Sequence, residues 1–332
     1  VLISTSGSAG KPKIVFLTWE SLFWNARAAN ERVRVGVGDM WFVDLPLWHV
    51  SGLCAMVRAL EAGATVCLAG GPEEQATHRS CVPTQLRRWL DSGRTPGMLR
   101  ELLVGGASMP AGMRIEASQK GWPARATYGL TEAGSQVCTG EKVGMPGEDL
   151  VSCGKPLEGW EIRLIDGEIW IRGKGLFAGY VKPEGDVVSE KCEGGWFATG
   201  DVGEWNERGE LRVLGRRDRM ILCAGEKVYP ERIEAELKAL KGIRQVFALG
   251  VEDREYGQRV VVFVDGEGEV GRWKEYLRER VSGLEMPVRW YRWPVENVLQ
   301  DSSAGTMKPQ GKFFEELLAR GTVGTYKLEE IG

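Results

Sequence analysis

The spacing of hydrophobic and polar residues divides the chain into regions with different patterns. In residues 1–130, short apolar runs alternate with amphipathic stretches, which predicts strands alternating with helices. That order is typical of an open, largely parallel sheet covered by helices. The strands are expected at Val1–Ile3, Ile14–Leu17, Met40–Leu45, Ala64–Leu68, Arg100–Val104 and Arg125–Tyr128. Thr18 is expected to cap a helix that runs to about Arg32, and further helices are expected at Gly52–Glu61, Pro83–Leu90 and Pro110–Ser118.

The later part of the chain predicts two further structures. Residues 150–215 contain short strands separated by turns, which favours a small antiparallel sheet or barrel. Residues beyond 219 mix helices and strands, as in an α+β unit. The predicted fold is therefore a layered α/β core with a small antiparallel sheet or barrel, followed by a smaller, mobile α+β C-terminal domain. The elements expected after residue 150 are strands at Glu161–Ile165, Glu168–Arg172, Glu210–Leu214, Gln245–Val251 and Arg259–Val264, and helices at Pro230–Leu240, Trp273–Val281 and Phe313–Ala319.

Composition narrows the class of protein. The chain has 332 residues, of which 43% are hydrophobic, enough to bury the cores of two units. The net charge is −3 and no long basic run occurs, which argues against nucleic acid or an anionic membrane as a partner. The seven cysteines never form a Cys-x-x-Cys pair, no apolar stretch approaches the ~20 residues of a membrane span, and no signal peptide is recognisable. We therefore expect a cytoplasmic protein with reduced thiols.

The segment between the first two strands has the composition of a phosphate-binding loop. Residues Thr5–Lys13 combine glycines, hydroxyl side chains and two lysines. Glycines let backbone N–H groups approach an anion, and hydroxyls and lysines add donors and positive charge. The spacing differs from the Walker loop, which needs Gly-x-x-x-x-Gly-Lys-Ser/Thr before a helix. A Ser/Gly-rich surface turn is the alternative interpretation.

Three further segments have side chains suited to a nucleotide. In Tyr128–Glu132 a tyrosine could stack on a purine and a glutamate could hold a hard cation, although an ordinary strand-to-loop turn has the same composition. Leu102–Ala107 is an apolar run that ends in Gly105 and Gly106, which permits close approach to a flat ligand or simply makes a tight turn. Gly195–Asp201 ends in a carboxylate that could accept hydrogen bonds from a ribose diol, or that belongs to a surface turn.

Taken together, these segments resemble the motifs of the adenylate-forming superfamily, which includes acyl-CoA synthetases, luciferases and adenylation domains. The chain keeps most of the phosphate-loop residues of that superfamily, with Ser8 and Ala9 in place of two threonines. The resemblance implies ATP, Mg²⁺ and coenzyme A as substrates or cofactors, with Glu132 as the metal ligand. The residues it assigns to ATP or AMP are Thr5, Ser6, Gly7, Ser8, Gly10, Lys11, Lys13, Gly105, Gly106, Ala107, Tyr128, Gly129, Thr131, Asp201 and Arg216.

The same resemblance covers a hinge and a C-terminal lysine. Gly215–Asp218 matches the hinge motif, in which Asp218 is the pivot, although a charged linker has the same composition. Near the C-terminus, Lys312 matches the lysine that the superfamily delivers to the carboxylate of the acid and to the α-phosphate of ATP. The alternative interpretation of this segment is an exposed Gly-Lys turn. The arginine that the superfamily places shortly afterwards is absent. These matches predict an adenylating core at residues 1–215, a hinge at 216–218 and a cap domain at 219–332.

Pro46–Leu53 is most similar to the o-succinylbenzoate–CoA ligases of menaquinone biosynthesis. There His49 would be catalytic, as a gate beside the acyl pocket, whereas a lone histidine is more often structural. Arg58 would face the second carboxylate of a dicarboxylic acid, because an unpaired carboxylate in an apolar pocket is costly. Its alternative interpretation is a solvent-facing helix arginine. The residues predicted to bind the acid are His49, Ser51, Arg58, Gly105 and Gly129, and the predicted catalytic residues are His49, Glu132 and Lys312.

The sequence thus predicts an ATP-dependent acid–CoA ligase that acts on o-succinylbenzoate. Its expected partners are a small carboxylic acid, ATP and CoA, without nucleic acid or a membrane span, and a homodimer is compatible with the sequence. A ligase for another aryl or fatty acid and a non-catalytic nucleotide-binding remnant are the alternatives. An amino-acid-activating domain is disfavoured, because no carrier domain is recognisable. Since the superfamily normally has a long segment before the phosphate loop, we expect either a fragment or a short member.

Overall fold

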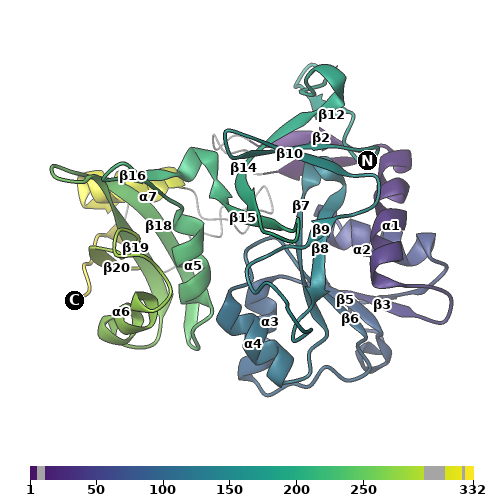
Figure 1. Cartoon of the computed structure of the whole chain (residues 1–332), viewed down its shortest axis with the longest axis horizontal. Helices are drawn as coiled ribbons and strands as arrows, with labels where there is room; N and C mark the ends of the chain where they lie inside the picture. The colour runs from purple at the N-terminus through teal and green to yellow at the C-terminus, as the bar shows by residue number, and fades with distance from the viewer. Residues whose placement is uncertain (6–11, 295–310, 324–325) are drawn as a thin grey trace. The chain divides into compact units, whose positions relative to one another are not determined.

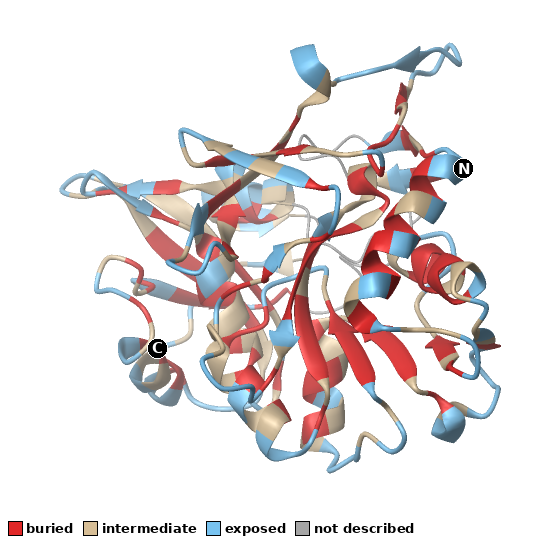
Figure 2. Cartoon of the chain, turned by 45° about the vertical axis from the view of Figure 1, so that its right-hand side comes forward, coloured by how far each residue is buried: buried red, intermediate tan, exposed pale blue. Residues whose placement is uncertain are grey.

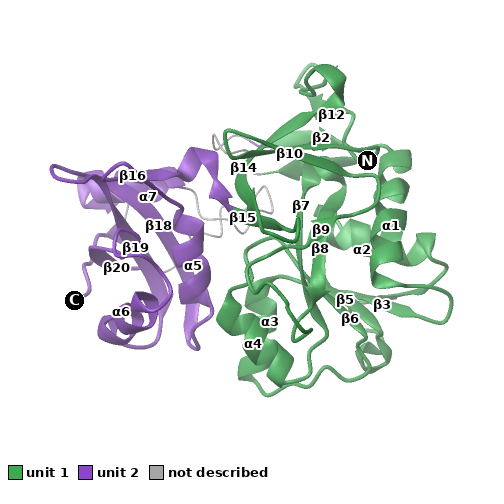
Figure 3. Ribbon diagram, viewed as in Figure 1, with its two compact units in different colours: residues 1–5, 13–213 green, residues 6–12, 214–332 purple. Residues whose placement is uncertain are grey.

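The computed structural model describes residues 1–5, 12–294, 311–323 and 326–332. Its described residues form two compact units, shown in different colours in Figure 3. Unit 1 contains Val1–Thr5 and Lys13–Val213, and unit 2 contains the residues from Leu214 onward. Each unit has its own hydrophobic core.

A seven-stranded sheet forms the centre of unit 1, with strand order β4-β3-β5-β6-β7-β8-β9. The strands from β4 to β7 are parallel, whereas β8 and β9 pair antiparallel. The carboxyl ends of the parallel strands therefore meet at one edge, where α/β proteins usually bind ligands. The strands are β3 (Met40–Val43), β4 (Thr65–Leu68), β5 (His78–Cys81), β6 (Glu101–Val104), β7 (Ala124–Leu130), β8 (Ser135–Lys142) and β9 (Lys155–Pro156).

Helices cover this sheet, and Figure 1 shows two pairs of them on opposite sides of the strands. The first pair is α1 (Trp19–Val33) with α2 (Val50–Glu61), and the second is α3 (Pro83–Asp91) with α4 (Ala111–Gln119). The Thr18 side chain caps α1 by accepting a hydrogen bond from Ser21 N over 3.0 Å. Figure 2 shows buried residues concentrated on the strands and on the inner faces of helices, as expected for amphipathic helices.

Two four-stranded antiparallel sheets complete unit 1, with orders β1-β2-β12-β13 and β10-β11-β14-β15. The prediction of a small antiparallel sheet is confirmed, and there are two such sheets. The Thr5–Lys13 segment joins two antiparallel strands, in which Thr5 is opposite Lys13. The strands are β1 (Leu2–Thr5), β2 (Lys13–Phe16), β10 (Glu161–Ile165), β11 (Glu168–Arg172), β12 (Gly179–Val181), β13 (Val187–Val188), β14 (Phe197–Trp205) and β15 (Leu211–Arg216).

Unit 2 is built around a five-stranded sheet in which β17, β16, β19 and β18 are successive neighbours and β20 pairs with β19. Helices α5 and α6 share a core with this sheet, and α7 packs through Phe314 and Leu317. The elements are β16 (Ile221–Cys223), β17 (Glu226–Val228), α5 (Pro230–Lys238), β18 (Ile243–Asp253), β19 (Gly257–Gly266), α6 (Val270–Arg278), β20 (Arg289–Arg292), α7 (Gly311–Arg320), β21 (Thr322–Val323) and β22 (Tyr326–Lys327).

The structure confirms the predicted fold class and adds elements that the pattern did not indicate. Strand β5 was not predicted, because its His78, Arg79 and Ser80 are polar although all are buried. The segment Gly215–Arg219, predicted to be a charged linker or hinge, is also more regular than expected, since β15 continues to Arg216 and a short 3-10 turn covers Arg217–Arg219. All seven cysteines are free thiols. Among the described helices, none is long and apolar enough to cross a membrane.

Candidate active site

Tyr128 and Asp201 form the first pair of the candidate site. Tyr128 lies near the carboxyl end of β7 and is buried, and its hydroxyl donates a hydrogen bond to Asp201 Oδ2 over 2.7 Å. Burial and the neighbouring Asp201 carboxylate raise the pKa of Tyr128, so the hydroxyl stays protonated and acts as a donor. Asp201 is itself held at its backbone, where its N–H donates to Thr199 Oγ1 over 3.1 Å. Two of the predicted nucleotide-binding motifs are thereby brought together.

Glu132 lies in the short 3-10 turn that follows β7. The Tyr180 hydroxyl, on β12, donates a hydrogen bond to Glu132 Oε1 over 2.7 Å and fixes the orientation of the carboxylate. Lys13 Nζ lies 4.3 Å from the centroid of the Tyr180 ring. A half-exposed, oriented carboxylate suits Mg²⁺, which is commonly held by one or two carboxylates together with substrate phosphates. Among the described residues no group of three or more His, Cys, Asp or Glu side chains could hold a metal ion, so the assignment of Glu132 as a metal ligand stays a prediction.

The glycines after β6 keep the backbone open beside β7. A side chain at Gly105 would place its Cβ 2.5 Å from Thr127 Oγ1, and Gly106 has a left-handed φ of +79°. Gly106 and Ala107 are exposed, so they lie at the surface of unit 1. The backbone is therefore accessible at these strand ends, and the assignment of these residues to a flat ligand stays a prediction. Gly129 is also indispensable, since its Cβ would overlap the backbone oxygen of Ser135.

Arg58, on α2, is buried rather than solvent-facing, with 2% of its surface exposed. This excludes the interpretation of Arg58 as an exposed helix arginine. Its Nη2 donates to Ser135 Oγ over 2.8 Å, and its guanidinium lies 5.5 Å from the Trp41 ring centroid. Burial lowers the pKa of Arg58 to about 10, which still leaves it protonated at neutral pH. Among the described residues, no carboxylate forms an ion pair with Arg58, so none of them supplies a counterion for this buried positive charge.

His49 and Ser51 form the N-terminus of α2. His49 is exposed and caps the helix, because its Nδ1 accepts a hydrogen bond from Ser51 N over 3.2 Å. Its Nδ1 also lies 2.8 Å from Ser51 Oγ. A histidine whose Nδ1 accepts carries its proton on Nε2 when it is neutral. His49 therefore has a structural function as a helix cap, in addition to the gating function that the sequence predicts.

The remaining predicted residues fall into two groups. Ser6, Gly7, Ser8, Gly10 and Lys11 lie outside the described residues, so their assignment stays a prediction. Arg216, Asp218 and Lys312 belong to unit 2. Arg216 Nε donates to Asp218 Oδ1 over 3.4 Å at the 3-10 turn, and Lys312 is exposed in the first turn of α7. Thr5 and Thr131 are half-buried beside the motifs described above.

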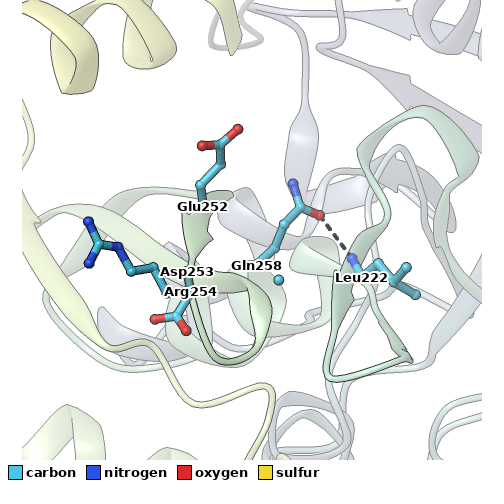
Figure 4. A pocket seen from close by; sticks show the side chains of 6 residues that line it. Leu222, Glu252, Asp253, Arg254 and Gln258 are labelled. Atoms are coloured by element: carbon cyan, nitrogen blue, oxygen red, sulfur yellow. Dashed lines mark hydrogen bonds between the residues drawn. The ribbon is translucent and has the colours of Figure 1, made fainter.

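Unit 2 also contains a pocket at the end of the β18–β19 hairpin (Figure 4). Gln258 Oε1 accepts a hydrogen bond from Leu222 N over 3.0 Å, and Glu252 and Arg254 project from the hairpin into solvent. None of the residues predicted to bind ATP or the acid lines this pocket.

Comparison with known proteins identifies the family. The sequence profile described as "AMP-binding enzyme" matches residues 1–181, more than half of the chain. The chain belongs to this family. It is similar to the 2-succinylbenzoate–CoA ligase of Salmonella typhimurium, with 38% identity over 299 residues, which is 88% of the chain and 64% of that protein. The chain thus spans less than two thirds of the length of this relative.

Solved structures of 2-succinylbenzoate–CoA ligases are also similar to the chain. A variant of E. coli MenE with bound OSB-AMS matches with a TM-score of 0.75 and 33% identity, covering 88% of this chain and 65% of that one. The o-succinylbenzoate coenzyme A synthetase (MenE) of Bacillus subtilis, in complex with ATP and a magnesium ion, matches with a TM-score of 0.76 and 30% identity, covering 88% of this chain and 66% of that one. These likenesses agree with the resemblance that the sequence motifs predict.

Sequence reasoning missed two residues that shape the site. Tyr180 orients Glu132, and Ser135 contacts Arg58. Tyr180 follows a Phe-Ala-Gly stretch that gives no chemical signal of its own. Ser135 is only three residues after Glu132. A hydroxyl side chain so close to the Tyr128–Glu132 motif could have indicated that Ser135 also belongs to the site.

Proposed function

We propose that this protein is an ATP-dependent acid–CoA ligase whose acid is 2-succinylbenzoate. In the first step a carboxylate oxygen bonds to the α-phosphorus of ATP, and the bond to the bridging oxygen breaks to release pyrophosphate. In the second step the CoA thiol gives up its proton and its sulfur bonds to the acyl carbon, which releases AMP and leaves a thioester. The family membership and the named relatives support the reaction class, and the chain's own residues support the choice of acid.

The observation that carries the choice of acid is the buried charge of Arg58, which no carboxylate of the described residues pairs. Placing a guanidinium in the interior costs free energy unless an anion accompanies it. A substrate with a second carboxylate supplies that anion, while a simple aryl or fatty acid does not. The second carboxylate of succinylbenzoate therefore complements the site, because a charge-assisted pair in a dry pocket is stronger than one in water.

The nucleotide is assigned to the carboxyl ends of β6 and β7. Asp201 would accept hydrogen bonds from the ribose hydroxyls, and its bond from Tyr128 keeps one oxygen in a fixed position. Gly105 and Gly106 leave space for the adenine ring. Glu132, oriented by Tyr180, would hold Mg²⁺, which when bound neutralises phosphate charge during the displacement.

Unit 2 is assigned the residues that change between the two steps. We assign Lys312 to the carboxylate and the α-phosphate in the first step, where a fixed positive charge stabilises the developing negative charge. Asp218 is assigned as the pivot of a rotation that removes Lys312 before CoA attacks. The exposed position of Lys312 at the start of α7 is compatible with such delivery.

Pyrophosphate release by the purified chain, measured with a panel of acids, tests the proposal. We expect turnover with 2-succinylbenzoate and at least tenfold less with benzoate and with fatty acids. Preference for a monocarboxylic acid would overturn the choice of acid and favour another acyl-CoA ligase. Binding of ATP by calorimetry, without pyrophosphate release for any acid, would show a nucleotide-binding remnant instead.

A further inference from the structure

We propose that Arg219 is a positioning residue for Lys312, because it joins the end of the hinge to the side chains that hold α7. The inference rests on the proposed function, in which unit 2 delivers Lys312 in the first step. The motif resemblance assigns Arg216 and Asp218 in the hinge segment and gives Arg219 no function. Two sets of contacts support the proposal, and both lie within unit 2.

The first set fixes the end of the hinge to α5 and β18. Arg219 is the last residue of the short 3-10 turn. Its Nη2 donates hydrogen bonds to Glu234 Oε1 over 2.6 Å and to Ala248 O over 2.9 Å. Glu234 Oε1 also accepts a hydrogen bond from Ala248 N over 3.0 Å, so the three residues form a closed ring. On α5, Glu231 Oε1 lies 3.1 Å from Arg219 Nη1.

These charged contacts are largely shielded from water. The side chain of Arg219 is 28% exposed, and those of Glu231 and Glu234 are 23% and 11% exposed. Charge-assisted hydrogen bonds in such surroundings are stronger than those at an exposed surface. Ala248 lies on β18, and its backbone N–H and C=O are both used in the ring. Unit 2 should therefore move as one body from Arg219 onward.

The second set of contacts leads from Arg219 to α7. The guanidinium of Arg219 lies 4.8 Å from the centroid of the Phe247 ring. Phe247 stacks on Phe314 of α7, with ring centroids 4.6 Å apart and an interplanar angle of 25°. Phe314 is fully buried and stands two residues after Lys312. A Cβ at Gly311, directly before Lys312, would lie 3.6 Å from Phe247 Cζ. The start of α7 thus packs on the ring that Arg219 covers.

This path makes the position of Lys312 depend on the hinge. The Lys312 side chain is exposed, so its location is set by the backbone of α7. A rotation at the hinge can bring Lys312 Nζ to a defined place only if the segment between hinge and α7 does not yield. A misplacement of about 1 Å can cost roughly 100-fold in rate. Loss of Arg219 should therefore damage the step that needs Lys312 and spare the step from which Lys312 is withdrawn.

Two variants test this selectivity. Arg219→Met removes the charge and keeps a long side chain, whereas Arg219→Lys keeps the charge and loses the planar fork. The kcat of pyrophosphate release with succinylbenzoate should fall about tenfold in Arg219→Met and about fivefold in Arg219→Lys. The KM of ATP should stay unchanged, because the nucleotide is assigned to unit 1. The reaction of supplied succinylbenzoyl-adenylate with CoA should stay within about twofold.

A matched control lies in the same unit. Arg244 Nε donates to Asp265 Oδ2 over 2.9 Å, and the two side chains form a bidentate pair that joins β18 to β19. Arg244→Met removes this ion pair without touching the contacts of Arg219. It should leave both half-reactions unchanged.

Hydrogen exchange separates positioning from a merely structural contribution. In Arg219→Met the amides of residues 214–222 should exchange about tenfold faster, while those of β19 and α6 keep their rates. Faster exchange throughout unit 2, or equal loss of both half-reactions, would overturn the positioning function while the proposed ligase reaction stands. If Arg219→Met does not fold, an undiminished first half-reaction in Arg219→Lys would also overturn it. If the unaltered chain releases no pyrophosphate with succinylbenzoate, the proposed function itself fails.

Discussion

Tyr128 and Asp201 are 73 positions apart in the chain, yet the tyrosine hydroxyl lies 2.7 Å from the aspartate carboxylate. The contact joins the end of β7 in the large sheet to β14 in an antiparallel sheet. Both residues were predicted to bind the nucleotide from separate motifs, and their direct hydrogen bond shows that the two motifs belong to one place in unit 1.

Removing that hydrogen bond should weaken nucleotide binding without unfolding the chain. Tyr128→Phe keeps the ring and loses the donor, so Asp201 becomes freer to rotate. We expect the dissociation constant of ATP to rise about tenfold, equivalent to ~1.4 kcal/mol, as for a lost bond to a charged group. Calorimetry measures this dissociation constant. Tyr276→Phe, which removes a comparable bond to Glu236 in unit 2, is the control, and an equal loss of affinity there would contradict the assignment.

The Arg58→Leu variant should separate activity from stability. We expect kcat/KM for succinylbenzoate to fall about 100-fold or more, because the second carboxylate loses its counterion. Stability in urea should be unchanged or higher, since an uncompensated buried charge is replaced by an apolar side chain. Arg88→Leu, an exposed position on α3, serves as the control. Undiminished succinylbenzoate turnover in Arg58→Leu would end the dicarboxylate assignment.

Glu132→Gln tests the metal assignment. An amide is a weaker ligand for Mg²⁺ than a carboxylate, so the Mg²⁺ concentration for half-maximal rate should rise about tenfold, with a lower maximal rate. Tyr180→Phe should produce a smaller change in the same direction, because it only releases the orientation of the carboxylate. Initial rates of pyrophosphate release across a Mg²⁺ titration give both values. An unchanged Mg²⁺ dependence in Glu132→Gln would place the metal elsewhere.

Lys312→Ala should abolish the first step and spare the second. A supplied succinylbenzoyl-adenylate should still react with CoA at a rate within about threefold of the unaltered chain, while pyrophosphate release is lost. Each half-reaction is measured separately. Lys327→Ala, an exposed lysine on β22, should affect neither. Equal loss of both half-reactions would be incompatible with the proposed assignment of Lys312.

Acid stability should depend on Glu116. Hydrogen bonds from Arg87 and Lys120, at 3.0 and 2.8 Å, lower the pKa of Glu116 to about 2. Because the folded-state pKa lies below the unfolded value of 4.5, the stabilisation is complete above pH 4.5 and disappears as the pH falls toward 2. The side chain is 32% exposed, so screening limits the contribution to about 1 kcal/mol.

The measurement compares Glu116→Gln with the unaltered chain by urea denaturation. The variant should be less stable at pH 7, and the difference should shrink below pH 4.5. Glu184→Gln, an exposed position, is the control that should show no such pH dependence. A difference that grows on acidification would have the wrong sign for this mechanism.

The sequence predicted the helices and the apolar strands well, because their periodicity is a local property. Helix α1 begins after its predicted cap Thr18 and ends one residue beyond the expected end. Strand β5 escaped prediction because its polar side chains are stabilised by distant partners. His78 stacks on Trp41 with ring centroids 5.3 Å apart, and Arg79 pairs with Asp44 and Glu73. The local pattern of hydrophobic and polar residues cannot show that these contacts make burial of the polar side chains of β5 possible.

The residues of the site could be predicted where a short sequence motif by itself indicates a chemical function. Tyr128, Glu132 and Asp201 stand in recognisable segments, and Arg58 follows one. Tyr180 is not predictable in this way, since its partner Glu132 is 48 positions away. The burial of Arg58 was equally hidden, because an arginine on a helix normally points to water. Only the packing of α2 against β8 shows where that side chain lies.

Gly129 shows how little tolerance this arrangement has. A methyl group there would occupy the place of the Ser135 carbonyl oxygen and push β7 away from the next strand. Tyr128 on one side and Ser135 on the other would shift together. One added carbon would then displace both Tyr128, which holds Asp201, and Ser135, which contacts Arg58, so random mutagenesis should recover almost no active substitution at this position.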